Sequence, residues 1–291
     1  MSAAITIHFR KPELTATCIK SLLADGWKPV FIWDNSADGG VTAHALQVQF
    51  SGDTRVLWGG TGENLGFGKG MNAALAELGH RGYAGPALLI NNDARVMEGM
   101  RTALHLQLQL QLQKANTPTL VAPRIEQDGM EQGWLHYQPW LALVTRKQLP
   151  GSFAYLSGCC LLVQRPNNAQ PLFDEDFFMY GEDVELSWRW KRQGWNLILL
   201  DCAWLVHEGS ASTGQASKGY EGFLVHSHWL LARKLTANGG ARFLMYMARL
   251  PSLLARACLR SLRYRSLVPL RALAHLASRC SNSPKNQTVR R

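Results

Sequence analysis

The amino-acid sequence predicts an α/β protein with a central, mostly parallel sheet and a C-terminal basic helical extension. Two observations predict this arrangement. Strand-like apolar runs alternate with helix-like segments through most of the chain, as in proteins built on a parallel sheet. The segment 222–291 carries 13 Lys and Arg side chains and no Asp or Glu. We therefore expect a sheet domain at 1–220, a basic helical extension at 221–280 and a disordered tail at 281–291.

The composition excludes several classes of protein. A chain of 291 residues with 46% hydrophobic and 18% charged residues can bury a large core and is not disordered. The net charge of +10 belongs to the extension, since the first 221 residues carry 18 basic and 21 acidic side chains. A nearly neutral body argues against nucleic-acid binding. The six cysteines lack metal-binding spacing and do not suggest a disulfide framework, which indicates a reducing compartment. No run reaches the roughly 18 apolar residues of a membrane span. We therefore expect a cytoplasmic protein.

The N-terminal segments predict the opening of a parallel βαβ unit. Strands are expected at 4–8 and 30–33, with a helix at 13–23 between them. Such units bind ligands at the carboxyl ends of their strands. Asp34 follows one of these ends, where its carboxylate can bind a nucleobase N–H or a ribose hydroxyl. An Asx-turn within DNSADGG is an equally good interpretation of the same residue.

A glycine-rich turn precedes the helix that we expect at 71–78. Gly66, Gly68 and Gly70 alternate with larger residues, among them Lys69. A turn of this kind at a helix N-terminus can offer backbone N–H groups to phosphate. The spacing matches neither a Walker A motif nor GxGxxG, so it indicates phosphate binding only weakly.

A buried central strand is expected at 86–90, and it runs into Asn91, Asn92 and Asp93. A carboxylate at the end of a buried strand is well placed to hold a divalent cation. One Asp is too few ligands by itself, so further ligands must come from water, from substrate oxygens or from elsewhere in the chain.

The stretch 173–212 concentrates acids, aromatic residues and one histidine. Glu182 and Asp183 open a helix, and His207 follows a strand. Within the stretch we expect a helix over 184–192 ended by Gly194, a strand over 195–200 and a second strand over 204–206. The carboxylates and the imidazole are placed to meet in one site. An ordinary acidic helix start and a surface histidine are the alternative interpretation.

The remaining elements complete the expected order. Leu and Gln alternate in LHLQLQLQLQ, a period typical of a strand, yet both residues favour helices and the leucines also recur every four positions, so we favour a helix. The expected elements are a helix at 104–113, a strand at 120–123, a loop at 127–150, a buried run at 153–163 interrupted by Ser157 and Gly158, and a helix at 221–235.

The extension is expected to hold two helix-like segments over 241–276, punctuated by Pro251 and Pro269. Its arginines share one helix face and its leucines another, which is typical of a helix on an anionic membrane surface. The arginines concerned are Arg242, Arg249, Arg256, Arg260 and Arg263. We expect peripheral membrane contact through 242–271. A helix that packs on the body with solvated arginines is the alternative.

Six motifs in sequence resemble one protein family. In order they are WDNSADGG, ENLGFGKGMN, LLINNDARV, LSGCCLLV, FDEDFFMYGEDVELSWRWKRQGW and HEGSAS. The chain resembles the family-2 glycosyltransferases of the GT-A fold, most closely their rhamnosyltransferase-like bacterial branch, over about residues 4–212. The resemblance implies an inverting enzyme that moves a sugar, with rhamnose as one candidate, from a nucleoside diphosphate to a hydroxyl of a cell-surface glycan or lipid-linked acceptor.

The resemblance also implies roles for individual residues. Asp183 would be the catalytic base, and Asp93 and His207 would ligate Mg²⁺ or Mn²⁺. Gly158 and Glu182 would line the acceptor or sugar pocket. The donor nucleotide would be bound by Asp34, Asn64, Lys69, Asn72 and Asn91. The chain departs from the family pattern at Asn91 and Asn92 of the metal motif and at Glu185, which replaces a frequent Asp.

The implied chemistry needs one positioned carboxylate. A metal ion can neutralise the leaving diphosphate, so a single base that deprotonates the acceptor hydroxyl is sufficient. We expect Asp183 to stay ionised in the first turn of its helix. Two alternatives stay open: the same fold using a UDP-hexose or GDP-mannose with polyprenyl phosphate as acceptor, and a non-catalytic module that binds nucleotide sugars. The set of Asp93, Asp183 and His207 argues against the second.

Overall fold

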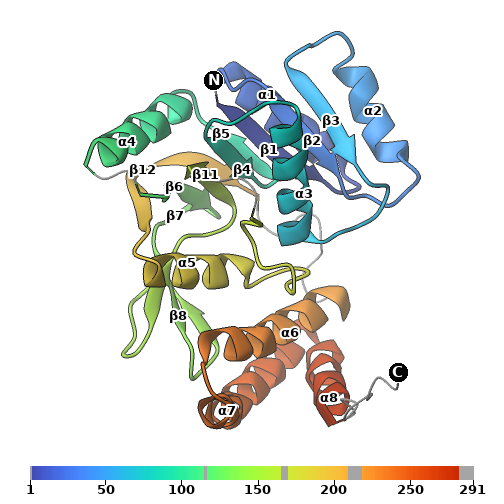
Figure 1. Cartoon of the computed structure of the whole chain (residues 1–291). Helices are drawn as coiled ribbons and strands as arrows, with labels where there is room; N and C mark the ends of the chain where they lie inside the picture. Colours follow the sequence, from blue (N-terminus) through green and yellow to red (C-terminus); the bar gives the residue numbers. More distant parts are fainter. Residues whose placement is uncertain (1, 115–116, 165–169, 209–217, 282–291) are drawn as a thin grey trace, which may run out of the picture. The chain divides into compact units, whose positions relative to one another are not determined.

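The described chain forms two compact units. The computed structural model describes residues 2–114, 117–164, 170–208 and 218–281, and Figure 1 labels its elements. The first unit holds residues 1–138 and 144–212, and the second holds 139–143 and 213–291. The sequence-based boundary after residue 220 falls inside the first helix of the second unit. The tail predicted at 281–291 lies outside the described residues from 282 onward.

The first unit begins with a parallel half-sheet. Its strands are β1 (Ala3–His8), β2 (Val30–Asp34), β3 (Val56–Gly60) and β4 (Ala87–Ile90), in the order β3-β2-β1-β4. All three pairings are parallel. Their apolar runs are buried because helices cover both faces of the sheet. The α/β fold predicted from the alternating pattern is confirmed.

The sheet continues beyond β4 with strands from later in the chain. These are β11 (Cys160–Gln164), β6 (Thr119–Gln127), β12 (Asn196–His207) and β5 (Ala94–Val96), and β7 (Met130–Gln132) pairs with β6. The β6–β12 pairing is parallel, whereas β11 and β5 run antiparallel to their neighbours. Antiparallel strands therefore enter the sheet only after the N-terminal βαβ half.

Helices pack on both faces of this sheet through two separate hydrophobic clusters. One cluster contains α1 (Pro12–Ala24) and α4 (Met100–Lys114). The other contains α3 (Phe67–His80) and α5 (Glu182–Arg192). A further helix, α2 (Val41–Gln49), lies between β2 and β3 in the chain and was not predicted. The helix favoured for the alternating Leu-Gln run is confirmed as α4, which buries Leu104 and Leu108.

The loop predicted over 127–150 is wrong. Besides β7, the region contains β8 (Leu135–Gln138) and β9 (Leu143–Thr145), which form a three-stranded sheet with β10 (Phe153–Tyr155) in the order β10-β8-β9. These strands have only three or four residues each. Such lengths are too short for an alternating apolar pattern to appear in the sequence.

The two strands predicted over 195–200 and 204–206 are one strand. β12 spans both, and its pairing with β6 shifts register between Leu199 and Leu205. Extra residues at a β-bulge interrupt the alternation without ending the strand. The exposed Asp201 lies in this interval, which explains why the sequence pattern breaks there.

The described part of the second unit contains three helices, α6 (Lys218–Leu235), α7 (Gly239–Tyr264) and α8 (Val268–Ser281). Asn238 caps α7, because its side chain accepts a hydrogen bond from Ala241 N at 2.8 Å. Among the described helices, none combines the length and the apolar character that crossing a bilayer requires.

Proline affects the two long helices differently. Pro251 was expected to punctuate the helix-like segments over 241–276, but it lies inside α7 and leaves that helix continuous. Pro269 lies in the first turn of α8, where a missing N–H costs nothing because it would have no intrahelical partner.

Candidate functional site

Asp93 and His207 meet at the same end of the sheet although 114 positions separate them. β5 and β12 bring them together, because His207 pairs with Ala94, the residue after Asp93. His207 Nε2 lies 3.1 Å from Asp93 Oδ1, and both side chains are largely buried. Glu208 N also donates to the Asp93 carbonyl at 3.1 Å. The two predicted metal ligands are therefore in contact.

The geometry of this pair suits a divalent cation. A carboxylate oxygen and a bare imidazole lone pair repel each other at 3.1 Å, so a proton or a cation belongs between them. Two adjacent ligands of an octahedral ion, each about 2.1 Å from it, lie about 3 Å apart. The other ring nitrogen, Nδ1, lies 3.4 Å from Gln127 Oε1. A proton on Nδ1 would leave Nε2 free to bind the ion.

A metal bound there would need ligands from outside the protein. Among the described residues, no group of three or more His, Cys, Asp and Glu side chains could hold a metal ion. Two protein ligands leave several coordination positions for water and for oxygens of the substrate.

Asp183 is fixed at the start of α5 by backbone N–H groups. Its Oδ2 accepts from Gly158 N at 3.0 Å, and its Oδ1 accepts from Val184 N at 2.8 Å. A Cβ at position 158 would press against the Asp183 side chain at 3.2 Å. Gly158 therefore orients this carboxylate, and the sugar-pocket role predicted for it stays a prediction.

Burial changes the acidity of the two neighbouring carboxyl groups. Burial raises the pKa of Asp183 above its ordinary value, although the N–H groups of Gly158 and Val184 oppose this. The expectation that Asp183 stays ionised took into account only the start of its helix, which lowers the pKa of Asp183. It did not take into account burial, which raises that pKa. Burial, and then the charge of Asp183, raise the pKa of Glu182 to about 8. Glu182 Oε2 is buried and has no hydrogen-bond partner in the described structure.

Short backbone links join Asp183 to the Asp93–His207 pair. Gly158, which binds Asp183, is followed by Cys159, whose carbonyl accepts from Asn91 N at 2.9 Å. Burial raises the pKa of the Cys159 thiol, and the charges of Asp93 and Asp183 add to this effect. The predicted base and the predicted metal ligands therefore lie on adjoining turns at one end of the sheet.

Asp34 forms the Asx-turn that was one of its two interpretations. Its Oδ1 accepts from Ser36 N at 2.9 Å. Its other carboxylate oxygen has no hydrogen bond to the described residues. The turn therefore holds the carboxylate at the end of β2 and leaves one oxygen for a ligand. Nucleobase recognition by Asp34 stays a prediction.

The N–H groups at the glycine-rich turn before α3 are already used within the protein. Gly66 N donates to Asn64 Oδ1 at 3.0 Å, and Phe67 N donates to Phe178 O at 2.9 Å. A side chain at Gly66, whose φ is +79°, would clash with the Phe178 carbonyl. Close packing of backbone therefore explains this glycine, and the phosphate cradle predicted for the turn is not supported at these two groups.

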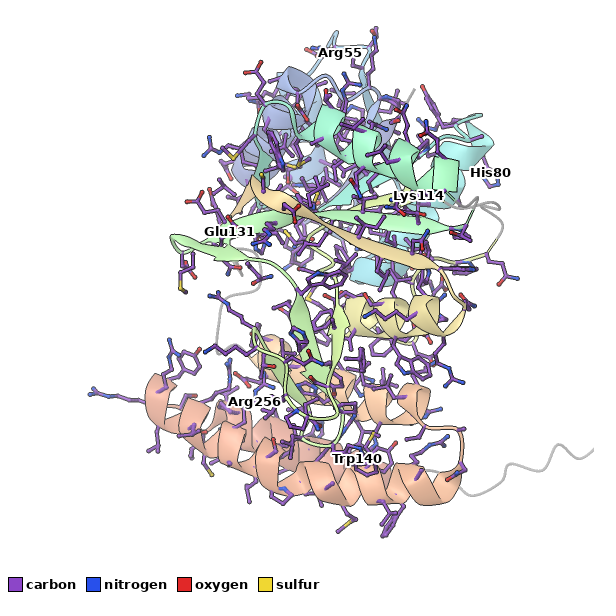
Figure 2. All side chains as sticks on the ribbon, turned by 90° about the vertical axis from the view of Figure 1, so that its left-hand side faces the viewer. Arg55, His80, Lys114, Glu131, Trp140 and Arg256 are labelled. Carbon is purple, nitrogen blue, oxygen red and sulfur yellow. The ribbon has the colours of Figure 1, made fainter. Side chains whose placement is uncertain are left out.

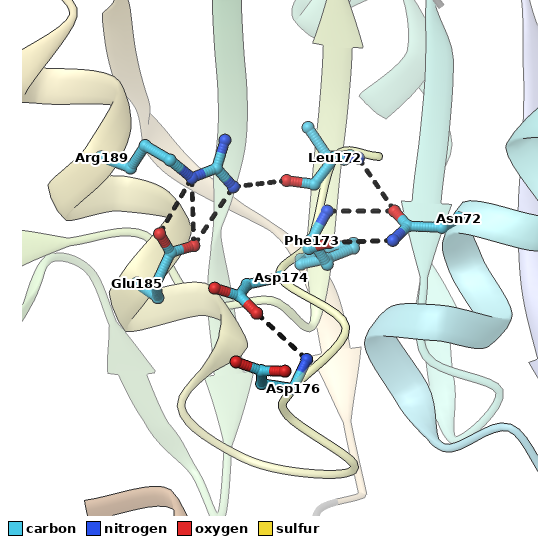
Figure 3. Close-up of polar contacts among 7 residues, drawn as sticks. All are labelled: Asn72, Leu172, Phe173, Asp174, Asp176, Glu185 and Arg189. Atoms are coloured by element: carbon cyan, nitrogen blue, oxygen red, sulfur yellow. Dashed lines mark hydrogen bonds and ion pairs between the residues drawn. The ribbon is translucent and has the colours of Figure 1, made fainter. Parts of the chain in front are cut away.

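Asn72 holds a neighbouring loop by hydrogen bonds. Its Oδ1 accepts from Leu172 N at 2.9 Å and from Phe173 N at 3.0 Å, and its Nδ2 donates to Phe173 O at 2.8 Å (Figure 3). The side chain is buried. The amide is thus engaged within the protein, and its Nδ2 also lies 3.2 Å from Glu175 Oε1. The role in donor-nucleotide binding that was predicted for Asn72 stays a prediction. Of the other residues predicted to bind the donor nucleotide, Lys69 is exposed, and Asn64 and Asn91 are partly exposed.

Arg189 holds the same loop from the opposite side and was missed in the sequence. Its Nη2 donates to Leu172 O at 2.6 Å, and its Nε donates to Glu185 Oε1 at 2.9 Å (Figure 3). An acid and an arginine four residues apart in a helix are a recognisable pair. The partner carbonyl at residue 172 has no signal in the sequence.

Comparison with known proteins identifies a relative. No family model matches the chain. The chain is 31% identical over 214 residues to the N-acetylglucosaminyl-diphospho-decaprenol L-rhamnosyltransferase of Mycobacterium tuberculosis (strain ATCC 25618 / H37Rv), and the match covers 64% of this chain and 68% of that enzyme. The protein of strain CDC 1551 / Oshkosh matches to the same extent.

Solved structures share the fold at low sequence identity. GalNAc-T7 with UDP, GalNAc and Mn²⁺ has a TM-score of 0.59 and 12% identity over 78% of this chain and 47% of that chain. The mannosyltransferase PcManGT from Pyrobaculum calidifontis, with GDP-Man and Mn²⁺, has a TM-score of 0.51 and 12% identity over 98% and 76%. S. aureus TarS 1-349 has a TM-score of 0.51 and 11% identity over 87% and 72%.

These neighbours are glycosyltransferases of the GT-A fold. Their likeness establishes the architecture, while the 31% identity to a rhamnosyltransferase extends over two thirds of that enzyme. The two findings agree with the order of motifs along the chain. This protein therefore belongs to the family-2 glycosyltransferases of the GT-A fold, in their rhamnosyltransferase-like branch.

Proposed function

We propose that the enzyme is an inverting, metal-dependent transferase that moves a sugar from a nucleoside diphosphate to a hydroxyl of a lipid-linked glycan acceptor. Rhamnose carried on dTDP is the first donor candidate, because the relative from M. tuberculosis is an L-rhamnosyltransferase. The name of that relative contains N-acetylglucosaminyl-diphospho-decaprenol. A sugar linked through diphosphate to a polyprenol is therefore the acceptor class that we propose.

The observation that carries this proposal is the position of Asp183. Two backbone N–H groups fix both of its oxygens, at 3.0 and 2.8 Å. Gly158, which supplies one of these groups, is followed by Cys159, whose carbonyl accepts from Asn91 N close to Asp93. A fixed carboxylate with a raised pKa is a stronger proton acceptor than a free one. It can remove the proton of the acceptor hydroxyl as that oxygen attacks the anomeric carbon from the face opposite the diphosphate. A single displacement of this kind inverts the configuration.

Asp93 and His207 would hold Mg²⁺ or Mn²⁺ together with oxygens of the donor. The bound ion would supply charge neutralisation for the leaving diphosphate, so no protein acid has to protonate it. The protein contributes the two ligands, the orientation of His207 by Gln127, and a largely buried setting.

Glu182 keeps the site from carrying two adjacent charges. With a pKa of about 8 it is mostly protonated at neutral pH, and Asp183 then remains the ionised member of the pair. When the environment gives two neighbouring carboxyl groups different pKa values, one can stay ionised while the other stays protonated. We assign Asp183 to proton removal and Glu182 to a neutral position beside it.

The test replaces Asp183→Asn and measures transfer from dTDP-rhamnose to a polyprenyl-diphosphate-linked N-acetylglucosamine. We expect kcat to fall by about 10³-fold, within the range for loss of a general base, while the donor dissociation constant stays within about threefold. Asp53→Asn, at the exposed end of a surface ion pair, is the matched control and should keep its activity. Activity of Asp183→Asn equal to that of the unchanged enzyme would refute the assignment.

Donor choice is tested separately by thermal shift. A panel of dTDP-rhamnose, UDP-hexoses and GDP-mannose, each with and without Mn²⁺, should show the largest stabilisation with one nucleotide and only when metal is present. Stabilisation without any transfer or donor hydrolysis would instead indicate a non-catalytic nucleotide-sugar-binding module. The configuration of the product, read by NMR, tests inversion.

A further inference from the structure

Three arginines of α7, Arg249, Arg256 and Arg260, face the interior of the helical unit. Arg249 is fully buried and donates to the carbonyls of Pro139 and His228. Arg256, which is labelled in Figure 2, places its Nη1 2.8 Å from His228 Nε2. Arg260 Nη2 bonds Glu221 Oε1 at 2.6 Å. These arginines bind groups of the protein, which corrects the prediction that they face an anionic membrane surface.

The opposite face of α7 is apolar and exposed. It contains an apolar stripe of large side chains whose exposed fractions range from 41% to 76%, namely Phe243, Leu244, Met247, Leu250, Leu254 and Leu262. Most of their spacings are three or four residues, so they share one side of the helix. The only charged residue that is exposed anywhere on α7 is Arg263. The polarity of the helix is thus inverted relative to an ordinary surface helix.

A short segment from earlier in the chain extends this surface. The Ser252 hydroxyl of α7 donates to the Leu141 carbonyl at 2.5 Å. That contact places Trp140 and Leu141, which are 42% and 41% exposed, beside the helix. An exposed tryptophan next to exposed leucines is typical of surfaces at the level of lipid headgroups.

The charges around the stripe favour one occupant. Arg263 and Arg265 are exposed at its C-terminal end. From residue 222 to the end of the chain there is no Asp or Glu. A second copy of the same face would bring apolar side chains together but could offer no carboxylate to these cations. A bilayer with anionic lipids complements both features, because it accepts apolar side chains between its headgroups and attracts the arginines.

We propose that α7 is a monotopic membrane helix, which lies in the interface of an anionic bilayer with the apolar stripe inserted between lipids. The arginines on its inner face hold the helical unit together, and only those at its end contact headgroups. None of the described helices could span a bilayer, so the helix lies in the plane of the membrane. Docking of this kind is independent of which donor sugar the enzyme uses.

The experiment measures binding of the full chain to vesicles of phosphatidylcholine with 30% phosphatidylglycerol by flotation. The unchanged protein should float with the vesicles. The triple variant Phe243→Gln, Leu244→Gln, Leu254→Gln should lose at least tenfold in partition coefficient, because three side chains no longer enter the bilayer. These positions are exposed, so the fold should persist.

A matched control replaces three apolar residues that are exposed in the first unit. Val41→Gln, Val48→Gln, Leu106→Gln removes similar exposed area from the chain, and this variant should bind vesicles as the unchanged protein does. Arg263→Gln with Arg265→Gln should weaken binding to anionic vesicles only, by several-fold. Unchanged flotation of the α7 triple variant would overturn the proposal. A dimer in solution that the triple variant dissociates, with no vesicle binding, would identify a second copy as the occupant instead.

Cys258 offers a direct readout, because it is exposed on the same side of α7. The variant Cys202→Ser, Cys280→Ser leaves it as the reactive thiol, since Cys18, Cys159 and Cys160 are buried. An environment-sensitive dye on Cys258 should shift to the blue on addition of anionic vesicles. An unshifted spectrum with bound vesicles would mean that another surface binds them.

Activity separates this proposal from the proposed reaction. The α7 triple variant should transfer sugar normally to a short-chain, water-soluble acceptor and at least tenfold more slowly to an acceptor embedded in vesicles. Failure of the unchanged enzyme on both acceptors would refute the reaction and leave the vesicle-binding result intact. Equal rates of the triple variant and the unchanged enzyme on the embedded acceptor would refute productive docking through α7.

Discussion

In the first unit the buried charged groups near the site are the carboxyls of Glu182 and Asp183, whereas in the second unit a buried guanidinium group, Arg249, and a buried carboxyl group, Glu221, both have partners. Glu182 leaves one buried oxygen without a hydrogen-bond partner in the described structure, whereas Arg249 donates to two carbonyls and Arg260 binds Glu221. An unpaired buried polar group costs free energy that a packed unit ordinarily avoids. In our proposal Glu182 is held for a substrate, whereas Arg249 and Arg260 hold the helical unit together.

The largest effect should come from removing a metal ligand. Asp93→Ala leaves His207 without its partner and should lower kcat/KM by about 10³-fold, or about 4 kcal/mol of transition-state stabilisation. The measurement is the transfer rate as a function of Mn²⁺ concentration. In Asp93→Ala the midpoint of this titration should move to a higher Mn²⁺ concentration, and the maximal rate should fall. The same metal dependence in Asp93→Ala and the unchanged enzyme would show that the metal binds elsewhere.

The second effect concerns stability. Arg249→Met keeps the bulk of the side chain but removes the hydrogen bonds that the guanidinium group donates to the carbonyls of Pro139 and His228, which should cost about 2–3 kcal/mol in the free energy of unfolding. Denaturation by urea measures it. Arg263→Met, at an exposed position of the same helix, is the control and should change stability by less than about 0.5 kcal/mol. Equal losses in the two variants would contradict the structural role of Arg249.

Sequence patterns predicted the parts of the fold that depend on local order. The runs around Ile5, Ile32 and Leu89 are mostly apolar, and such runs predict buried parallel strands. The short strand β5 was not predicted, because three residues carry no period. Yet β5 is the strand that brings Asp93 to His207. The resemblance implied that Asp93 and His207 bind one metal ion, whereas the strand pairing that brings the two side chains together was not predicted.

Periodicity also failed to predict the orientation of α7. The sequence places the arginines on one face of the helix and the leucines on another, but it does not say which face points to solvent. Arginines are ordinarily exposed, so the arginine face was expected on the surface. The interior instead offers Glu221 and two carbonyls, which lie far away in the sequence. Asn72 shows the same limit, because an amide in a glycine-rich motif does not reveal that it will bind the backbone of Leu172 and Phe173.

The third effect depends on pH. Glu182 has an ordinary pKa near 4.5 when unfolded and about 8 in the fold. Between these values the folded state holds a proton that the unfolded chain has released, so this group's contribution to stability falls as pH rises through the window. Relative to Glu182→Gln, which does not titrate, the unchanged protein should lose on the order of 2 kcal/mol from pH 6 to pH 8. Urea denaturation of both proteins at the two pH values measures this difference, and parallel curves would contradict it.

The smallest effect applies the same change to the buried acid of the second unit. Glu221→Gln removes the negative charge that binds Arg260 at 2.6 and 2.8 Å, and the amide can accept only a weaker hydrogen bond. Because Arg260 is partly exposed, we expect a loss of about 1 kcal/mol at pH 8. At that pH Glu182→Gln should stabilise the protein, since it removes an unpaired buried charge. The same Glu→Gln change would then raise the free energy of unfolding in the first unit and lower it in the second. A loss of stability in both variants at pH 8 would show that the site of the first unit is packed for structure, as the helical unit is.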